Sequence, residues 1–447
     1  MFRQDSFRRS VAAGATLAVA VLFSACNDPV SSSGEGPKTS DPPPAIQSVV
    51  TGAHTCALTI TGAAYCWGYN ANGQLGNNGT GTITATPVRT VGDIVFESLS
   101  VSKVDDVSCG LSTSGAAYCW GKNDKGQLGN NNTGTVTATP VRTVGGIVFA
   151  SVSVSKVDDV TCGLSTSGAA YCWGKNDRGQ LGDGTTTRRL VPTPVAGGLR
   201  FKSLAVGTGH ACAVAVSGIA YCWGSSPNGA FGDGSTGTRL TPMISAPGLT
   251  FESIVAGGDY TCALTTVGAA YCWGVGALGQ LGDGAVEMRT TPVAVEGGLA
   301  FRALAGAGQG VCGLTTDGKA YCWGHNFYGT VGDGTVMRRL TPVPVSGDLT
   351  FRSLSAGWQT VCGVTDFGAS YCWGYNFGAL GDGDIEHSSV PVPVVGGQSF
   401  RSVAAGTGYA CAVTTTNAVV CWGSNNDGEL GDGTTQTRLV PVAVHWQ

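Results

Sequence analysis

One tripeptide, Cys-Trp-Gly, recurs along the chain and limits the possible folds more than any other feature. Its eight copies begin at Cys66, Cys119, Cys172, Cys222, Cys272, Cys322, Cys372 and Cys421. Successive copies lie 49 to 53 residues apart, so nearly all of the chain beyond its first 45 residues is a repeat array. A unit of this size buries its hydrophobic face only by packing against neighbouring units.

Each unit has the same order of short, alternating segments separated by turn residues. In the fifth unit a strand at 262–265 and a turn precede 269–274, followed by a Gly-rich loop at 279–284 and extended segments at 292–295 and 299–304. No helical period is present, and 71 glycines argue against helices, because glycine costs about 1 kcal/mol in a helix interior. Four short strands per unit are typical of an all-β propeller blade.

The first unit carries a longer motif around its Cys-Trp-Gly. Gly52-Ala53-His54-Thr55 is followed by Tyr65-Cys66-Trp67-Gly68, Asn70 and Gly73-Gln74-Leu75-Gly76. Over residues 46–447 the pattern resembles the regulator of chromosome condensation repeat family. The resemblance implies a β-propeller, commonly of seven blades. The eight copies predict about eight four-stranded blades, with seven as the alternative.

The two ends of the array suggest how the ring closes. The chain ends on an extended 441–444 segment, without the Phe-x-Ser-Leu strand that follows it in other units. Residues 46–50, at the start of the array, resemble that missing strand. We therefore expect the two ends to complete one blade between them, which would leave the sheet edges paired.

Sixteen of the 17 cysteines form pairs ten residues apart. If Ile60-Thr61-Gly62 is a three-residue hairpin loop, Cys56 lies directly opposite Cys66, about 4.5 Å away between Cα atoms. Gly62 suits the left-handed end of such a loop, as does Asn417 in the eighth unit. This register predicts one disulfide in each blade, with free thiols or a metal site as alternatives. The remaining pairs are Cys109 with Cys119, Cys162 with Cys172, Cys212 with Cys222, Cys262 with Cys272, Cys312 with Cys322, Cys362 with Cys372, and Cys411 with Cys421.

Two further repeated features favour structural roles. One Trp per unit at a fixed position indicates packing between blades more than a ladder of Trp residues that binds a ligand.

A recurring Gly-Asp-Gly lacks the alternating oxygen ligands of a calcium loop. In five units an Arg follows this Asp by six residues, as Arg289 follows Asp283, and the first two units lack both. We interpret the two residues as an ion pair that braces the loop, with an Arg-lined binding ring as the alternative.

The N-terminal segment has the order of an export signal. Three arginines in residues 1–10 precede an uncharged apolar run at 11–23, too short for a bilayer span of roughly 20 residues. Residues 22–26 resemble a bacterial lipobox, so 1–26 is predicted to be a lipoprotein signal with Cys26 lipidated; an ordinary signal peptide is the alternative. Residues 27–44, rich in Ser, Gly and Pro, are expected to be a flexible tether to a propeller at 45–447. The predicted location is the bacterial cell envelope, with membrane contact through the lipid anchor only.

Aromatic residues vary from unit to unit at two positions, before the first Cys and after Cys-Trp-Gly. They concentrate in the sixth and seventh units, and exposed aromatics are the usual anchors of an interface. We expect both positions to lie on one face and the aromatics of these two units to cluster there; local loop packing is the alternative. The candidate binding face is Tyr260, His325, Phe327, Tyr328, Trp358, Tyr375, Phe377 and Tyr409.

No catalytic constellation stands out in the sequence. The five His residues have no metal-ligand spacing, no phosphate-binding loop is present, and a net charge of −4 disfavours nucleic acid. We therefore expect a monomeric, non-enzymatic scaffold without cofactor or metal that binds an unknown protein or glycan. An envelope hydrolase with a central-channel site is the alternative. Guanine-nucleotide exchange, the activity of the family's namesake, is disfavoured because no unit carries an insertion long enough to act as a wedge.

Overall fold

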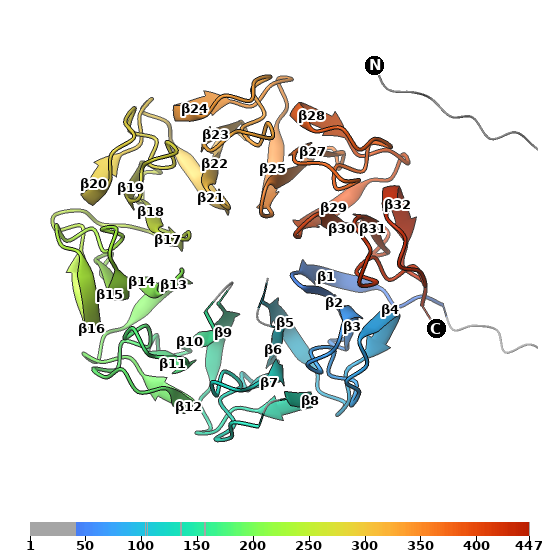
Figure 1. Cartoon of the computed structure of the whole chain (residues 1–447), viewed down its shortest axis with the longest axis horizontal. Helices are drawn as coiled ribbons and strands as arrows, with labels where there is room; N and C mark the ends of the chain where they lie inside the picture. The colour runs from blue at the N-terminus through green and yellow to red at the C-terminus, as the bar shows by residue number, and fades with distance from the viewer. Residues whose placement is uncertain (1–41, 103, 105, 135, 156–157, 447) are drawn as a thin grey trace, which may run out of the picture. The chain divides into compact units, whose positions relative to one another are not determined.

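A computed structural model of the chain describes residues 42–446 except 103, 105, 135 and 156–157. Every regular element in this part of the chain is a β-strand, and the 32 strands form eight four-stranded antiparallel sheets. The sheets are arranged as a ring around a common axis (Figure 1). The prediction of an eight-bladed, all-β propeller is confirmed, and the seven-bladed alternative is wrong.

The four strands of each blade follow one another along the chain, from the axis outward (Figure 1). Blades one to four contain β1 (Ile46–Thr51), β2 (His54–Thr59), β3 (Ala64–Tyr69), β4 (Ile83–Arg89); β5 (Phe96–Val101), β6 (Val107–Ser112), β7 (Ala117–Lys122), β8 (Val136–Arg142); β9 (Phe149–Val154), β10 (Val160–Ser165), β11 (Ala170–Gly174), β12 (Arg189–Pro194); β13 (Phe201–Val206), β14 (His210–Ala215), β15 (Ala220–Ser226) and β16 (Gly237–Ser245). Blades five to eight contain β17 (Ser253–Ala256), β18 (Tyr260–Leu264), β19 (Ala270–Gly274), β20 (Arg289–Ala294); β21 (Phe301–Ala307), β22 (Gly310–Thr315), β23 (Ala320–Gly324), β24 (Arg339–Pro344); β25 (Phe351–Ala356), β26 (Thr360–Thr365), β27 (Ser370–Gly374), β28 (Ser388–Pro393); β29 (Phe400–Ala405), β30 (Tyr409–Thr414), β31 (Val419–Gly423) and β32 (Arg438–Ala443).

The hairpin of the second and third strands has the predicted register in every blade. Cys56 lies opposite Cys66 and Leu58 opposite Ala64, and the same pairing of cysteines recurs in the other seven blades. Gly62 and Asn417 have φ angles of 84° and 65°, the left-handed conformation that the turn requires. All eight pairs are disulfides with Cα atoms 4.1 Å apart, which confirms the prediction of one intrablade disulfide per blade.

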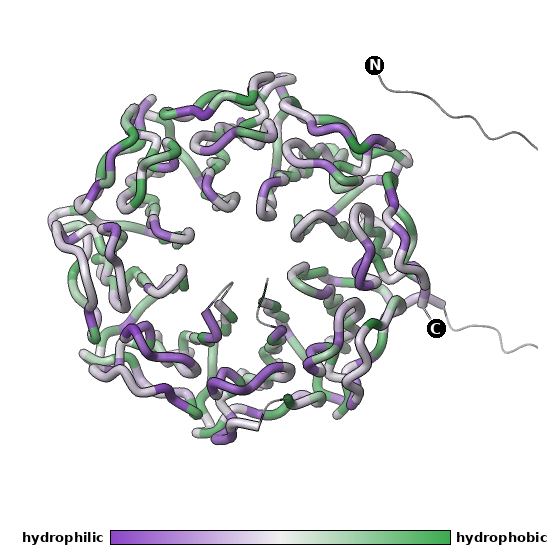
Figure 2. Tube along the Cα trace, viewed as in Figure 1, coloured by the Kyte–Doolittle hydropathy of each residue, from purple (hydrophilic) through white to green (hydrophobic). Residues whose placement is uncertain are grey.

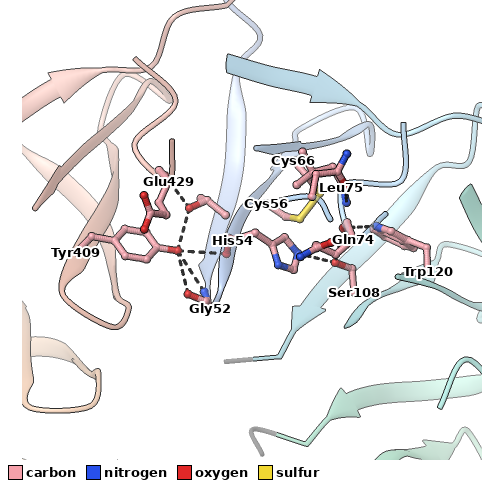
Figure 3. The surroundings of a disulfide bond; sticks show 12 residues. Gly52, His54, Cys56, Cys66, Gln74, Leu75, Ser108, Trp120, Tyr409 and Glu429 are labelled. Carbon is pink, nitrogen blue, oxygen red and sulfur yellow. Dashed lines mark hydrogen bonds between the residues drawn. A yellow bond between two sulfur atoms is a disulfide. The ribbon is translucent and has the colours of Figure 1, made fainter. Parts of the chain in front are cut away.

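The repeated Trp residues join neighbouring blades, as predicted. Each is fully buried, and its indole Nε1 donates to a backbone carbonyl in the Gly-rich loop of the preceding blade at 2.7 to 3.1 Å. Trp120, for example, donates to Gln74 O at 2.7 Å (Figure 3). A Cβ on Gly76 would lie 2.9 Å from the Trp120 indole nitrogen, so the contact itself explains the second glycine of Gly-Gln-Leu-Gly. Hydrophobic residues recur in every blade around the ring (Figure 2).

The ring closes differently from the prediction that the chain ends share one blade. β1 pairs with β2 in the first sheet, and β32 completes the eighth sheet, so that prediction is wrong. β1 is followed by β2 after only Gly52-Ala53, so the local hairpin forms, and β32 pairs with β31 of its own blade. A side-chain contact also joins the two blades: Trp446, which follows β32, packs edge-on against Tyr65 of the first blade with ring centroids 5.3 Å apart.

The closing interface nevertheless repeats the bonds of the other seven. At those seven, the backbone N–H of the blade's first Phe donates to the hairpin-turn Gly of the preceding blade at 2.7 to 2.8 Å. At closure, Ile46 N donates to Asn417 O at 2.8 Å, with Ile replacing Phe and Asn replacing Gly. Trp67 likewise donates to Glu429 O at 2.7 Å. The first and eighth blades are therefore joined as any other pair.

Candidate functional site

The loops of each blade divide between the two faces of the ring. We call the connection between the first and second strands the inner loop, and that between the third and fourth strands the outer loop. Because neighbouring strands are antiparallel, inner and outer loops lie at the same end of a blade, and the hairpin turn lies at the other. The face that carries inner and outer loops is therefore the one on which the predicted binding residues lie, as expected.

A cavity of about 580 Å³ opens where the inner loops converge on the axis, and we call it the central cavity. Inner loops of seven blades line it, together with outer-loop residues of the eighth blade and Tyr69 at the end of β3. Glycine dominates these loops because neighbouring backbones approach closely. A Cβ on Gly52, for example, would lie 2.2 Å from the carbonyl oxygen of Ser102 in the next blade.

Three carboxylates line the central cavity: Asp106, Asp427 and Glu429. Burial raises the pKa of Asp106 although Asn72 donates to its Oδ2 at 2.9 Å, and the charge of Asp427 raises it further. Glu429 is only 9% exposed, and burial raises the pKa of its carboxyl as well. Its Oε2 accepts a hydrogen bond from the Asp427 backbone at 2.9 Å. The cavity therefore has one acidic, partly desolvated wall.

Two residues of the predicted binding face, Tyr260 and Tyr409, line the central cavity, but they are buried, so the expectation that they are exposed is wrong. Each is 2% exposed, and burial raises the pKa of both phenols. The Tyr409 hydroxyl contacts the backbones of Gly52 and His54 in the first blade (Figure 3). It also accepts from the Thr55 hydroxyl at 3.0 Å. The Tyr260 hydroxyl donates to Gly310 O in the sixth blade at 3.0 Å. Both side chains fix one blade to the next.

Four of the predicted residues do cluster on the outer loops of the sixth and seventh blades. Phe327 packs against Tyr328, Tyr328 against Tyr375, and Tyr375 against Phe377, with ring centroids 4.9 to 5.2 Å apart. His387, which sequence reasoning left among scattered histidines, stacks on Tyr375 at 4.9 Å and completes the cluster. We call these five side chains the aromatic patch. Phe327 and Phe377 are 68% and 55% exposed, so the patch faces solvent.

Buried asparagines hold the two loops that carry the patch. Asn326 directly precedes Phe327; its Nδ2 donates to two carbonyls across the outer loop, at 2.9 and 3.0 Å, and its Oδ1 accepts from Val331 N. Asn376 makes the same three kinds of bond before Phe377, and its backbone N–H donates to His387 Nδ1 at 3.0 Å. Each aromatic side chain therefore projects from a loop whose conformation is already fixed.

Trp358 and His325 lie apart from the aromatic patch. Trp358 is 53% exposed, but it lines the central cavity, and none of the described ring contacts joins it to the patch. The expectation that it clusters with Phe327 and Phe377 is therefore wrong. An inner loop converges on the axis, whereas an outer loop lies farther out in the blade (Figure 1). His325 is partly buried and has no described ring contact with the patch, and burial lowers its pKa.

The five predicted Asp–Arg pairs are formed. Arg289 Nε donates to Asp283 Oδ2 at 2.7 Å, and three of the other four pairs have the same geometry at 2.5 to 2.6 Å. The fourth blade differs because Arg239 is 3.5 Å from Asp233 and lies over the Phe231 ring, 5.9 Å from its centroid. In the first two blades Thr84 and Thr137 occupy the Arg position, opposite Gly68 and Gly121. The arginines brace loops and are not arranged as a free ring.

Within the described part of the chain, no three or more His, Cys, Asp or Glu side chains are grouped so that they could hold a metal ion. The same residues include no helix with the length and apolar character needed to cross a bilayer. Cys26 and the segment around it lie outside the described residues.

Comparison with known proteins identifies relatives of this propeller. A family model described as an RCC1-like domain matches residues 23–314 and again residues 164–447. The human E3 ubiquitin-protein ligase HERC2 is 32% identical over 168 residues, 36% of this chain but 3% of the ligase. The ultraviolet-B receptor UVR8 of Arabidopsis thaliana is 32% identical over 174 residues, 38% of this chain and 39% of the receptor. The matches thus span well under two thirds of either relative.

Two solved structures have the same fold at low sequence identity. Human WBSCR16 superposes with a TM-score of 0.62 at 18% identity, covering 77% of this chain and 96% of that one. Prp20p from Saccharomyces cerevisiae, described with its binding to Gsp1p and histones, has a TM-score of 0.62 at 20% identity. That match covers 78% of this chain and 91% of Prp20p. At these identities the similarity establishes the fold alone.

Proposed function

This chain belongs to the RCC1-like domain family of β-propellers, and on that premise we propose that it is a non-enzymatic scaffold that binds a protein partner through the aromatic patch. The observation that carries the proposal is the exposure of Phe327 and Phe377 within a continuous cluster of five rings. Exposed aromatic clusters are uncommon on a monomer without a partner, and aromatic side chains supply most anchors of protein interfaces.

The surroundings of the patch favour a protein over a glycan. Val336, Met337 and Ile385, on the same two outer loops, are 60%, 69% and 53% exposed. Exposed apolar and Met side chains on the same loops as aromatic rings are typical of a protein interface. Phe327 and Tyr375 also meet Tyr328 edge-on, at interplanar angles of 88° and 79°. This arrangement gives an uneven apolar surface that a protein side chain can fill.

The rigidity of the loops lowers the entropic cost of binding. Asn326 and Asn376 fix the loop backbones, and a disulfide crosses the hairpin behind each loop. A surface held in its bound conformation loses little freedom on association, so more of its contact energy contributes to affinity. The propeller therefore supports a preformed docking surface.

We also propose that the protein acts at the bacterial cell envelope, anchored through lipidated Cys26 after removal of residues 1–25. The basic, apolar and small-residue order of the leader supports this location. The eight disulfides also favour an oxidising compartment. The tether predicted at 27–44 would then separate the propeller from the membrane surface.

An envelope hydrolase with its site in the central cavity stays the alternative prediction. One observation favours it: three carboxylates, Asp106, Asp427 and Glu429, line this cavity. A screen of the purified propeller on glycan and peptide substrates tests it; turnover that Asp427→Asn abolishes would favour it over a scaffold. Guanine-nucleotide exchange, by contrast, gains no support from the outer loops, which differ in length by only a few residues between blades.

A pull-down from envelope extract tests the proposed function. The baits are the tagged chain, a patch variant carrying Phe327→Ala and Phe377→Ala, and a control variant carrying Phe367→Ala. Phe367 is 93% exposed on the hairpin turn of the seventh blade, at the opposite end of the same sheet from Phe377. The control thus removes a Phe from the other face that is even more exposed than the two patch residues.

We expect a protein that the wild type and the control variant retain equally, and that the patch variant retains at least tenfold less. The patch variant should melt close to the wild type, because changes at exposed positions are mild. Equal retention by all three baits would place the partner elsewhere, and loss only with Phe367→Ala would place it on the hairpin-turn face. Retention of glycans alone would replace the protein partner with a glycan.

A further inference from the structure

Three consecutive blades carry an arginine at the same position of the first strand. Arg302, Arg352 and Arg401 directly follow the Phe that begins β21, β25 and β29. The corresponding residues of the fourth and fifth blades, Lys202 and Glu252, form an ion pair with each other. Among the described residues, no carboxylate is paired with any of the three arginines. These blades therefore place three guanidinium groups side by side on the inner strands of the ring.

Each of these guanidinium groups is held against the next blade. Arg302 Nη2 donates to Phe351 O at 2.8 Å and to Arg352 O at 3.1 Å. Arg352 Nη2 donates to Phe400 O, and Arg401 bonds to the first strand of the first blade in the same way. One nitrogen of each group is thus used between blades. This contact fixes the groups in place before any ligand arrives, which lowers the entropic cost of binding.

A cavity of about 290 Å³ lies between the sixth and seventh blades, and Arg302 and Arg352 both line it. We call it the arginine pocket. The strands that carry the two arginines, β21 and β25, are neighbours on the inner side of the ring (Figure 1). Phe301, next to Arg302, pairs with Thr315 beside the hairpin turn, and the seventh blade has the same register. The arginine pocket therefore lies toward the hairpin-turn face, away from the aromatic patch.

The rest of the arginine pocket is mainly apolar. Leu304, Leu314 and Leu354 line it, together with Ala303. The other seven units have Ser at the position of Ala303, so only the sixth unit lacks the hydroxyl there. A second cavity of about 300 Å³ shares Leu304 and Leu354 with the pocket and adds Val255. Apolar side chains therefore continue along the channel wall beyond the two arginines.

The two arginines have N–H donors to spare. The Nε of Arg352 is buried and has no hydrogen-bond partner among the described residues. A buried N–H without an acceptor is unfavourable, and an anionic oxygen is a strong acceptor for a guanidinium group. A small turn of the Arg352 side chain toward the pocket would give this N–H such an acceptor. Arg302 is exposed, and its described bonds use only Nη2, so its Nε and Nη1 can donate to the same anion.

We propose that the arginine pocket binds an anionic amphiphile, a ligand with a carboxylate or phosphate head and an alkyl body. The head bonds to Arg302 and Arg352, because the planar guanidinium fork matches the oxygens of either anion. The body lies along Leu304 and Leu354 toward the second cavity. Two sources share this chemistry: an alkyl carboxylate and an alkyl phosphate. The site is independent of the aromatic patch and does not rest on the proposed function.

Calorimetric titration of the full-length chain with matched probes tests the proposal. The carboxylate arm uses octanoate and the phosphate arm uses octyl phosphate, each below the concentration at which it forms micelles. Two probes serve as controls: 1-octanol lacks the anionic head, and inorganic phosphate lacks the alkyl body. We expect an anionic amphiphile to bind at least tenfold more tightly than either control. Binding in one arm only identifies the head group, and binding in both shows that either anion suffices.

Variants of the arginine pocket and a matched control locate the binding. Arg302→Gln with Arg352→Gln should weaken binding of the anion at least tenfold, because it removes both charges. Arg401→Gln is the control and should bind as the wild type, because Arg401 also bonds to the next blade but does not line the pocket. Ala303→Leu, at an exposed position, fills the pocket and keeps both arginines, so it should weaken binding several-fold even if the double variant folds poorly.

Any of four results would overturn the proposal: neither anionic amphiphile binds, a control probe binds as tightly as they do, both pocket variants bind like the wild type, or Arg401→Gln weakens binding as much as the pocket variants. The patch variant Phe327→Ala with Phe377→Ala should bind as the wild type. Failure of the patch in the pull-down would leave these titrations unchanged, so the two proposals fail separately.

Discussion

The Asp283–Arg289 pair gives the sharpest test of how the outer loops are held. Asp283 is 7% exposed; its Oδ2 accepts from Arg289 Nε at 2.7 Å, and its Oδ1 accepts only from Ala285 N at 3.2 Å. Arg289→Thr would leave a buried carboxylate without its charged partner, at a cost of about 2–3 kcal/mol. Asp283→Asn would leave an Arg that is 35% exposed and able to turn to solvent, at a cost of about 1 kcal/mol.

The double variant recreates a combination that the chain already contains. The first two units have Asn and Thr at these positions, and Asn77 Oδ1 still accepts from the loop backbone at Gly79 N, 3.2 Å away. We therefore expect the double variant to cost about 1–2 kcal/mol, less than the sum of the two single changes, with a coupling free energy of about 1–2 kcal/mol.

Hydrogen exchange measures this coupling locally, because it reports the opening free energy of the fifth sheet separately from the other seven. Amides of β19 and β20 report the perturbed loop, and those of β31 and β32 serve as the internal reference. Asp382→Asn is the matched control, because Asp382 has no Arg six residues later. Ser388 occupies that position, opposite Gly374. Single changes that add within about 0.5 kcal/mol would refute the pairing as a brace and favour arginines that serve a ligand.

Three further predictions concern stability, redox state and location. Burial lowers the pKa of His54 to about 3. Between pH 6.5 and 3 the unfolded chain therefore binds a proton at this residue, and the folded chain does not. The free energy of unfolding should therefore fall as the pH drops below 6.5, by up to about 1.4 kcal/mol per pH unit from this residue. The variant His54→Val carries the residue found at this position in the second and third units, and its urea midpoint should fall less steeply with pH. Equal pH dependence of the urea midpoint in the variant and the wild type would contradict the assignment. Cys262→Ser with Cys272→Ser should lower the free energy of unfolding by about 2–3 kcal/mol and leave the other seven pairs oxidised. Paired cysteines that are alkylated in the denatured, unreduced wild type, as detected by mass spectrometry, would contradict the disulfides. Cys26→Ala should move the protein out of the membrane fraction, and unchanged membrane retention of the variant would contradict anchoring through a lipid on Cys26.

The sequence predicted the features that local geometry fixes. A ten-residue spacing and a Gly or Asn in the turn determine the register of the hairpin, so the opposition of Cys56 and Cys66 followed without tertiary information. Comparison of the units predicted the Asp–Arg pairs, because both residues are absent together from the first two. One Trp per unit similarly predicted the contact between blades, which structure shows as a hydrogen bond to a loop carbonyl.

Features that depend on the ring as a whole were predicted less well. The order of strands along the chain is the same whether the first strand joins the first blade or the last one. The loop between β1 and β2 is only Gly52-Ala53, and this short connection favours the pairing of β1 with β2. The residue type at the position of Tyr260 and Tyr409 differs between units, which suggested an exposed position. The position is instead buried between inner loops, and His54 and His210 occupy it in the first and fourth units. Trp358, two residues before β26 begins, faces the cavity instead.

Photocrosslinking in living cells tests most directly whether the partner sits on the aromatic patch. The photoreactive residue p-benzoylphenylalanine replaces Phe377 in one strain and Phe367 in another, so the two probes lie at opposite ends of the same blade. We expect a discrete crosslinked protein from Phe377→p-benzoylphenylalanine, loss of that crosslink when Phe327→Ala is added, and no crosslinked protein from position 367. Crosslinks from position 367 alone, or from neither position, would contradict it.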